Sequence, residues 1–258
     1  DNEPHPERFP DGVDAFVDNL HEHGMEFGLW FDTRIAPHAE CCDEQAHVLI
    51  EPDPGQFGPG KNFGSRDFFG TGLVDLARQA GRDWLEDLLE RMITEYGARW
   101  IWIDMNTFPR HVYWNYLEEP DRRGLMELKF YQGLYEVFDR VLERHPDVRV
   151  ETCGNGGMYI DLAMLRLSHS IWIDDYVGFE VLGQPYDIDV NRNFRSALCQ
   201  WLPGPLPQNS LYIPWEVTQS DEVYDPIHYV SHFAGTLTFG QRVQQWKESD
   251  MEMAARAV

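Results

Sequence analysis

Two kinds of segment alternate along this chain. Short, continuously apolar runs end in acidic or polar residues, and longer stretches carry apolar residues at the three- and four-residue spacing of an amphipathic helix. The apolar runs predict strands over residues 25–31, 98–104, 148–153, 170–175 and 210–214. The helical spacing predicts helices over residues 12–24, 81–97, 125–146, 159–167, 190–202 and 225–240. Residues 33–72 are rich in Gly, Pro and Asp and are expected to be irregular.

Strands that alternate with helices, and that are apolar throughout, are typical of a parallel sheet covered on both faces. No Gly-rich phosphate loop follows any of these strands, which disfavours a nucleotide-binding doubly wound sheet. Polar groups instead follow the strands in succession: Asp32, Asp104, Glu151 with Cys153, and the pair Asp174 and Asp175. In a (β/α)8 barrel this end of the strands forms the active-site face. We therefore expect an α/β chain with the TIM-type barrel fold.

The number of strands is too small for a closed barrel. Five or six are visible where eight are needed, and the first predicted element is a helix. We expect one barrel domain over residues 1–258 that lacks its first one or two strands. The chain does not begin with Met, and its polar, Pro-rich opening has no signal-peptide pattern. It is expected to be a piece of a longer protein, so the compartment, cytoplasmic or secreted, stays open.

The composition argues against nucleic acid and membranes as binding partners. The net charge is -23, from 21 basic and 44 acidic residues, and such a surface repels nucleic acid and anionic lipid. No apolar run reaches the ~20 residues of a membrane span. Four cysteines, two of them adjacent, do not make a disulfide framework. A neutral sugar is compatible with this charge, so an oligosaccharide or glycoside substrate is expected. A homo-oligomer could form through domains absent from the chain.

Carboxylates on different strands of one barrel face suit glycoside hydrolysis. One attacks the anomeric carbon, and the other protonates the leaving oxygen and then activates water. Asp104 and the pair Asp174 and Asp175 are the natural candidates. Aromatic residues near the strand ends would provide stacking surfaces for sugar rings, although Trp100 and Trp102 share one face of their strand and could instead fill the layer between barrel and helices.

Four segments carry a more specific resemblance: "HGMEFGLWFD", "LVDLARQAGRDWLEDLLERMITEYGARWIWIDMN", "LERHPDVRVETCGNGGMYID" and "SHSIWIDD". In this order and spacing they resemble the barrel of glycoside hydrolase family 36, the retaining α-galactosidases and their relatives. The resemblance implies that Asp104 is the nucleophile and Asp175 the acid/base, with Asp174 as the second choice. It implies a double-displacement reaction on a terminal α-linked sugar, without a cofactor or metal.

The resemblance also implies a sugar site. Its expected members are Trp30, Asp32, Trp102, Asn106, Cys153, Gly156, Gly157, Trp172 and Arg192, with Arg195 as an alternative to Arg192. Trp102 stands where the family has a lysine, and Tyr159 where it has an arginine. The upstream Asp-Asp-Gly-Trp motif of the family is absent from this chain. The reaction type is therefore better supported than the identity of the sugar, and α-galactose is the default.

Other functions stay open at this point. The chain could be a barrel fragment that binds sugar without cleaving it, or one that transfers the sugar to another acceptor. A metal-dependent barrel hydrolase is a further alternative, since His38, Cys41, Cys42 and His47 mimic a metal cluster. Adjacent cysteines are poorly spaced for tetrahedral coordination, however. The residues "HEH" at 21–23 are expected to be solvated, and Cys153 to be a buried thiol. Asp75 and Glu151 are expected to have structural roles.

Overall fold

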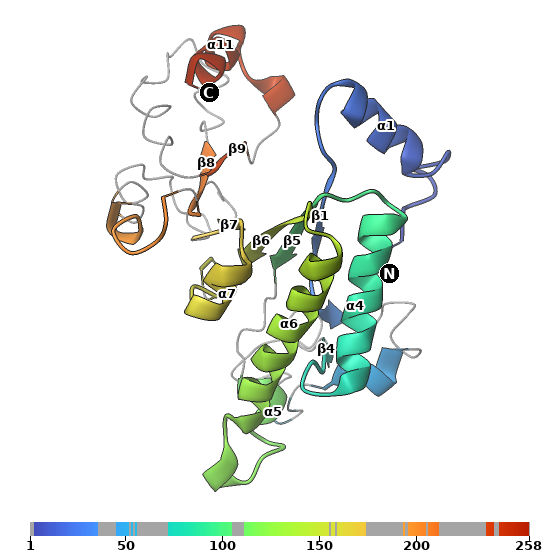
Figure 1. Cartoon of the computed structure of the whole chain (residues 1–258), viewed down its shortest axis with the longest axis vertical. Helices are drawn as coiled ribbons and strands as arrows, with labels where there is room; N and C mark the ends of the chain where they lie inside the picture. Colours follow the sequence, from blue (N-terminus) through green and yellow to red (C-terminus); the bar gives the residue numbers. More distant parts are fainter. Residues whose placement is uncertain are drawn as a thin grey trace. The chain divides into compact units, whose positions relative to one another are not determined.

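The computed structural model describes residues 3–35, 45–51, 53, 55, 72–104, 111–154, 156–157, 159–173, 193, 196–204, 206–211, 236–239 and 243–257 (Figure 1). The chain divides into two compact units. The first is Asp1–Val150 with Leu162–Leu167, and the second is Glu151–Asp161 with Ser168–Val258. The prediction of one barrel domain over residues 1–258 stays a prediction.

The main sheet is built from the strands predicted as continuously apolar runs. Its strand order is β1 (Gly28–Phe31), β5 (Trp100–Asp104), β6 (Arg149–Cys153) and β7 (Ser170–Ile171). β1 pairs with β5 in parallel, and β6 pairs with β7 in parallel. The prediction of an α/β chain with a parallel sheet is therefore confirmed.

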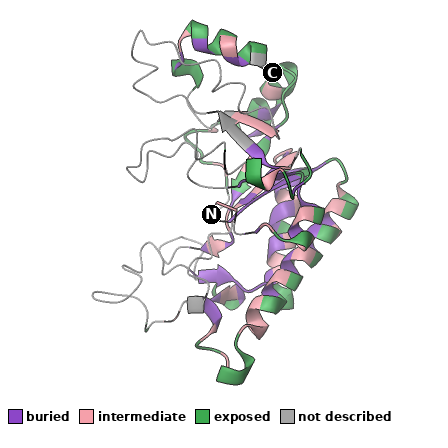
Figure 2. Cartoon of the chain, turned by 90° about the vertical axis from the view of Figure 1, so that its left-hand side faces the viewer, coloured by how far each residue is buried: buried purple, intermediate pink, exposed green. Residues whose placement is uncertain are grey.

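Two long amphipathic helices, α4 (Gln79–Thr94) and α6 (Leu125–Arg144), pack against each other and lie beside the strands β1 and β5 of the same unit (Figure 1), and Figure 2 shows the buried residues in purple. Each helix buries one stripe of apolar residues at the predicted spacing. These are Leu85, Leu88, Leu89, Met92 and Ile93 in α4, and Phe130, Leu134, Val137, Phe138 and Val141 in α6. On the strands, Phe31, Ile101 and Ile103 are almost fully buried. This apolar core holds the strand ends in place.

Charged side chains also join the two helices. Glu86 of α4 accepts hydrogen bonds from Arg140 Nε at 2.8 Å and from Arg144 Nη2 at 2.6 Å. Glu90 of α4 accepts from Arg144 Nε at 2.8 Å and lies 2.8 Å from His145 Nε2. Burial alone would raise the pKa of Glu86 and of Glu90, but their cationic partners outweigh it and lower both pKa values. These five residues form the interhelix ion network.

Glycines bring both helices against the turn that follows β4 (Gly72–Val74). A Cβ atom on Gly81 of α4 would overlap the carbonyl oxygen of Asp75, and one on Gly133 of α6 would overlap that of Leu76. Asp75 itself fixes the turn, as expected. Its Oδ1 accepts a hydrogen bond from the Ala77 N–H at 3.1 Å, and its Oδ2 lies 2.9 Å from Arg78 Nε.

Short segments precede the helix α6. They are α5 (His111–Trp114) and the 3-10 helix η2 (Pro120–Arg122). Glu118 lies between them and accepts hydrogen bonds from the N–H groups of Gly124 and Met126, both at 2.8 Å. The carboxylate therefore satisfies two of the N–H groups that the first turn of α6 leaves without intrahelical partners.

The expectation for residues 33–72 is wrong at three short strands. β2 (Arg34–Ile35) and β3 (Leu49–Ile50) both pair antiparallel with β4, which begins at Gly72. The 3-10 helix η1 (Ala46–Val48) precedes β3. Strands of two or three residues are too short to produce a recognisable alternation of polar and apolar positions. Arg34 belongs to this small antiparallel sheet, in which it pairs with Leu73 of β4.

The second unit contains β8 (Gln208–Leu211) and β9 (Thr236–Phe239), which pair in parallel. The predicted helix over residues 225–240 is therefore wrong at 236–239, where alternating threonines with Leu237 and Phe239 favour a strand. The 3-10 helix η4 (Val243–Gln245) and the helix α11 (Glu248–Ala257) follow, and neither was predicted.

Two shorter helices agree with the sequence-based ranges. α1 (Asp14–Glu22) lies within the predicted 12–24, and α7 (Leu162–Leu167) within 159–167. Of the helices in the described ranges, none combines the length and the apolar character that crossing a bilayer requires.

Candidate active site

The ends of β1 and β5 place aromatic and acidic side chains together. Trp30 pairs with Trp102 and Phe31 pairs with Ile103 in the parallel register. Asp104 closes β5, and Asp32 follows β1 by one residue. Because side chains alternate between the two faces of a strand, the two tryptophans and the two aspartates share one face. This set of four residues is the strand-end site.

The burial pattern of β5 decides which of its faces meets the core. Ile101 and Ile103 are almost fully buried, whereas Trp100, Trp102 and Asp104 keep part of their surface accessible. The alternative that the tryptophans fill the layer under the helices therefore does not fit, since the isoleucines form the fully buried face. Trp30, at 52% exposed, presents an indole surface beside Trp102.

One side-chain oxygen of Asp104 is buried. Its Oδ1 is inaccessible to solvent and has no hydrogen-bond partner within the described residues. A buried polar atom without a partner costs stability, so it is expected where a ligand or a reacting group completes the bonding. The predicted role of Asp104 as the nucleophile stays a prediction.

Within the described part of the chain, both side-chain oxygens of Asp32, unlike Oδ1 of Asp104, have hydrogen-bond partners. Its Oδ1 accepts a hydrogen bond from the Arg34 N–H at 3.0 Å, and its Oδ2 accepts from Arg34 Nε at 2.8 Å. Arg34 Nη2 also lies 2.7 Å from Oδ2. Burial raises the pKa of Asp32, Arg34 opposes that effect, and the charge of Asp104 raises the pKa further. The sequence analysis did not identify Arg34, and the only signal for it was the acidic and basic pair two residues apart in "DTR".

The second unit contains the end of β6 and the loop after it. Cys153 is buried, in agreement with the expectation of a buried thiol. Gly156 and Gly157 both have positive φ, and a Cβ on Gly157 would overlap the carbonyl oxygen of Ile173. The paired glycines therefore let this loop lie directly against the chain that follows β7.

Trp172 is hydrogen-bonded to the strand β6. Its main-chain N–H donates to the carbonyl of Thr152 at 2.9 Å, and the residue is buried. Within this unit the structure thus brings together Cys153, Gly157 and Trp172 at the carboxyl ends of β6 and β7. Their predicted contact with sugar stays a prediction.

Several predicted site residues lie outside the described residues. They are Asn106, Asp174, Asp175, Arg192 and Arg195. The choice between Asp175 and Asp174 as the acid/base, and the separation of either from Asp104, stay predictions.

The metal alternative can be examined for part of the chain. His38, Cys41 and Cys42 are outside the described ranges. Within those ranges, no three His, Cys, Asp or Glu residues are grouped so that they could hold a metal ion. The histidines of "HEH" make local contacts on the surface: His21 Nε2 lies 3.5 Å from Glu26, and His23 Nδ1 lies 2.8 Å from the carbonyl of Asn19.

Comparison with known proteins adds independent evidence. The family model described as Melibiase matches residues 1–179. Alpha-galactosidase 1 of Pediococcus pentosaceus is 30% identical over 169 residues, which are 65% of this chain and 22% of that protein. Alpha-galactosidase Mel36A of Lactobacillus acidophilus is 26% identical over 168 residues, again 65% of this chain and 22% of that protein. The chain thus spans about a fifth of the length of these relatives.

Solved structures share the fold over the whole chain. The alpha-galactosidase of Lactobacillus brevis aligns with 100% of this chain and 32% of its own, with a TM-score of 0.77 and 20% identity. The GH36 alpha-galactosidase AgaA of Geobacillus stearothermophilus aligns with 99% of this chain and 33% of its own, with a TM-score of 0.75 and 18% identity.

Proposed function

The chain belongs to the Melibiase family, and from this premise we propose that it forms part of the catalytic domain of an α-galactosidase-like glycoside hydrolase. Its parallel sheet would belong to a TIM-type (β/α)8 barrel, with the strand-end site on the active face. The names of the relatives support α-galactosides as the substrate class. Structures of AgaA variants in complex with raffinose and stachyose support terminal α-linked galactose on an oligosaccharide.

The environment of Asp104 is the observation on which this proposal depends. A nucleophilic carboxylate must keep an oxygen free to bond to the anomeric carbon, and Asp104 Oδ1 has no hydrogen-bond partner within the described residues. Asp32 is a poorer nucleophile because Arg34 occupies both of its oxygens. We therefore assign the nucleophile to Asp104, the last residue of β5.

The second carboxylate would be Asp175, with Asp174 as the second choice. In the first step it protonates the oxygen of the leaving group while Asp104 forms a glycosyl-enzyme, and in the second step it removes a proton from the attacking water. This double displacement retains the anomeric configuration. It requires the two carboxyl groups to lie about 5–5.5 Å apart, whereas inversion requires roughly 6.5–9.5 Å.

The remaining residues would hold the sugar. Trp30 and Trp102 offer indole surfaces beside the nucleophile, and aromatic faces bind the C–H face of a sugar ring. Asn106 and Arg192 would donate hydrogen bonds to hydroxyl groups. Cys153, Gly156, Gly157 and Trp172 would form the wall provided by the ends of β6 and β7.

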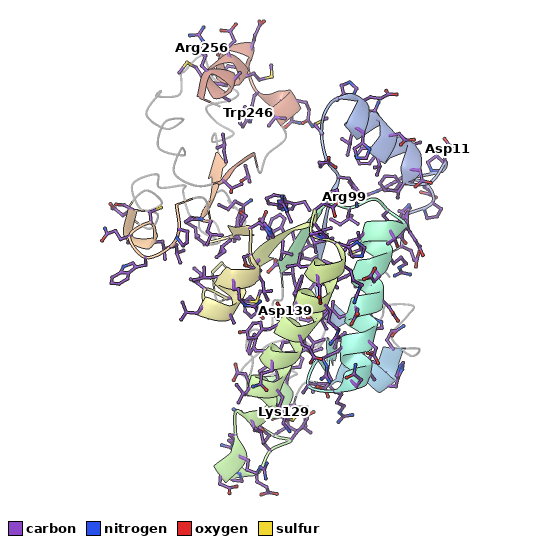
Figure 3. All side chains as sticks on the ribbon, in the orientation of Figure 1. Asp11, Arg99, Lys129, Asp139, Trp246 and Arg256 are labelled. Atoms are coloured by element: carbon purple, nitrogen blue, oxygen red, sulfur yellow. The ribbon has the colours of Figure 1, made fainter. Side chains whose placement is uncertain are left out.

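An azide rescue experiment tests the nucleophile. In the complete natural protein, Asp104→Gly should reduce hydrolysis of an aryl α-galactoside by at least about 10³-fold. Added azide should restore release of the aryl group and yield the β-galactosyl azide, because azide replaces the missing carboxylate from the same face. Asp139→Gly is the matched control, because Asp139 lies on α6 (Figure 3), where it binds Arg166, and is not one of the residues of the strand-end site. Full activity of the Asp104 variant would refute the assignment.

A further inference from the structure

Arg34 is held firmly beside the strand-end site. It begins β2, where it pairs antiparallel with Leu73 of β4, and only 20% of its side chain is exposed. Its Nε and Nη2 atoms lie 2.8 Å and 2.7 Å from Asp32 Oδ2, and its own N–H donates to Oδ1 at 3.0 Å. A planar guanidinium fixed in this way holds both the charge and the orientation of the carboxylate.

The carboxylates of Asp32 and Asp104 repel each other when both are ionised. They follow paired positions on adjacent parallel strands, and the charge of Asp104 acts on Asp32. Two neighbouring carboxylates without a cation cannot both ionise at their ordinary pKa values. Within the described residues, the charged groups that act on Asp32 are Arg34 and Asp104. Asp75, at the end of β4, is neutralised separately by Arg78.

We propose that Arg34 is a positioning residue for the reaction: it fixes the Asp32 carboxylate and offsets its negative charge beside Asp104. This inference rests on the proposed function, because it takes Asp104 to be the nucleophile. Arg34 touches neither the sugar nor the reacting atoms in this scheme. It acts through Asp32, and its contribution is therefore visible in the pH at which the nucleophile ionises.

The proposal predicts opposite effects for the two members of the pair. Without the guanidinium, an ionised Asp32 opposes ionisation of Asp104, so the nucleophile ionises at higher pH. Without the Asp32 charge, the remaining Arg34 favours ionised Asp104, so the nucleophile ionises at lower pH. Removal of both charges restores neutrality beside Asp104.

The acid limb of the pH profile of kcat/KM measures this ionisation in the free enzyme. In the complete natural protein with an aryl α-galactoside, Arg34→Gln should move the limb up by about one pH unit, the scale of a nearby charge. Asp32→Asn should move it down, and the double variant should return it close to that of the unmodified protein. Arg166→Gln is the control: it removes an Arg–Asp pair outside the strand-end site, with Arg166 Nη1 and Nη2 at 2.6 Å and 2.8 Å from Asp139, and should leave the limb unchanged.

A merely structural role would lower kcat or stability in Arg34→Gln with the acid limb unmoved, and that result would overturn the proposal. If Arg34→Gln does not fold, the acid limb of the Asp32→Asn variant tests the proposal without it. This variant preserves the shape of the side chain and an oxygen acceptor, and an acid limb that stays or rises would overturn the proposal. Failure of the proposed function is recognised separately, because the unmodified protein would then not hydrolyse the aryl α-galactoside, and failure of the nucleophile assignment because Asp104→Asn would then remain fully active.

Discussion

Trp30 and Trp102 lie directly opposite each other on the parallel strands β1 and β5, two residues before Asp32 and Asp104. A pair of indoles thus borders the carboxylate to which we assign the nucleophilic role. The family resemblance predicts a lysine at position 102, and a lysine would bring three strong donors for sugar hydroxyls. Trp102 instead brings an aromatic face, which favours contact with C–H groups over contact with hydroxyls.

We expect this difference to be visible in sugar selectivity. Trp102→Lys should increase the preference for plain α-galactoside over other aryl α-glycosides by at least about tenfold, because one added charged hydrogen bond contributes about 1.5 kcal/mol or more. Trp102→Phe retains the aromatic face and should keep the original order of preference. The measurement is the ratio of kcat/KM values across a panel of aryl α-glycosides. An unaltered ratio in Trp102→Lys would show that position 102 does not select the sugar.

The interhelix ion network should contribute to stability at neutral pH. Glu86→Gln removes the charge that Arg140 and Arg144 share, and we expect the free energy of unfolding to fall by about 1 kcal/mol, the upper range for partly exposed pairs. Chemical denaturation measures the change. Glu252→Gln is the control, because its contact with Arg256 is 3.7 Å long and both side chains are well exposed. Equal effects of the two substitutions would mean that the network adds nothing beyond a surface pair.

The same network should make stability depend on acidity. The pKa values of Glu86 and Glu90 in the folded chain lie below the ordinary value of 4.5. Each therefore contributes stability that is fully present above the unfolded pKa and is lost as the pH falls through the folded pKa. Unfolding followed from pH 7 downward should show the loss beginning near the ordinary value, and Glu86→Gln should reduce the slope below it. A slope unchanged by the substitution would place the acid sensitivity elsewhere.

The loop after β6 should tolerate no side chain at position 157. Gly157→Ala combines a φ of +93° with overlap against the carbonyl oxygen of Ile173. Gly12→Ala is the matched control, because its φ is +84° but nothing lies within 4 Å of the added atom. The conformational cost of about 1–2 kcal/mol should be common to both variants. Thermal unfolding and hydrolysis rates should show an additional loss in Gly157→Ala alone, since only there must a neighbouring main-chain group, the carbonyl of Ile173, move.

The strand that ends at Asp104 was predicted at its correct C-terminal end, because a buried parallel strand is apolar throughout and the charge marks its tip. The helices α4 and α6 were equally visible in their apolar spacing. The strands β2, β3 and β4 were not, since two or three residues carry no measurable period. Residues 236–239 were assigned to a helix because the apolar residues before them fit helical spacing, whereas pairing with β8 determines their conformation.

The same limit applies to the site. Asp104 and Asp32 could be found because each follows an apolar run, and their neighbourhood follows from parallel pairing. Arg34 could not be found in this way, because its role depends on the position of β2 in the small antiparallel sheet. Sequence periodicity indicates which residues share a strand or a helix face, but it does not indicate which cation reaches a given carboxylate.

The close packing at Gly81 and Gly133 should restrict which residues evolution accepts at these two positions. At both positions any side chain would enter the space of a main-chain carbonyl in the turn after β4. Descendants that keep this helix spacing should therefore keep both glycines even after their substrate, or their catalysis, has changed. The two positions thus offer an evolutionary marker of the scaffold that is independent of the chemistry at the strand ends.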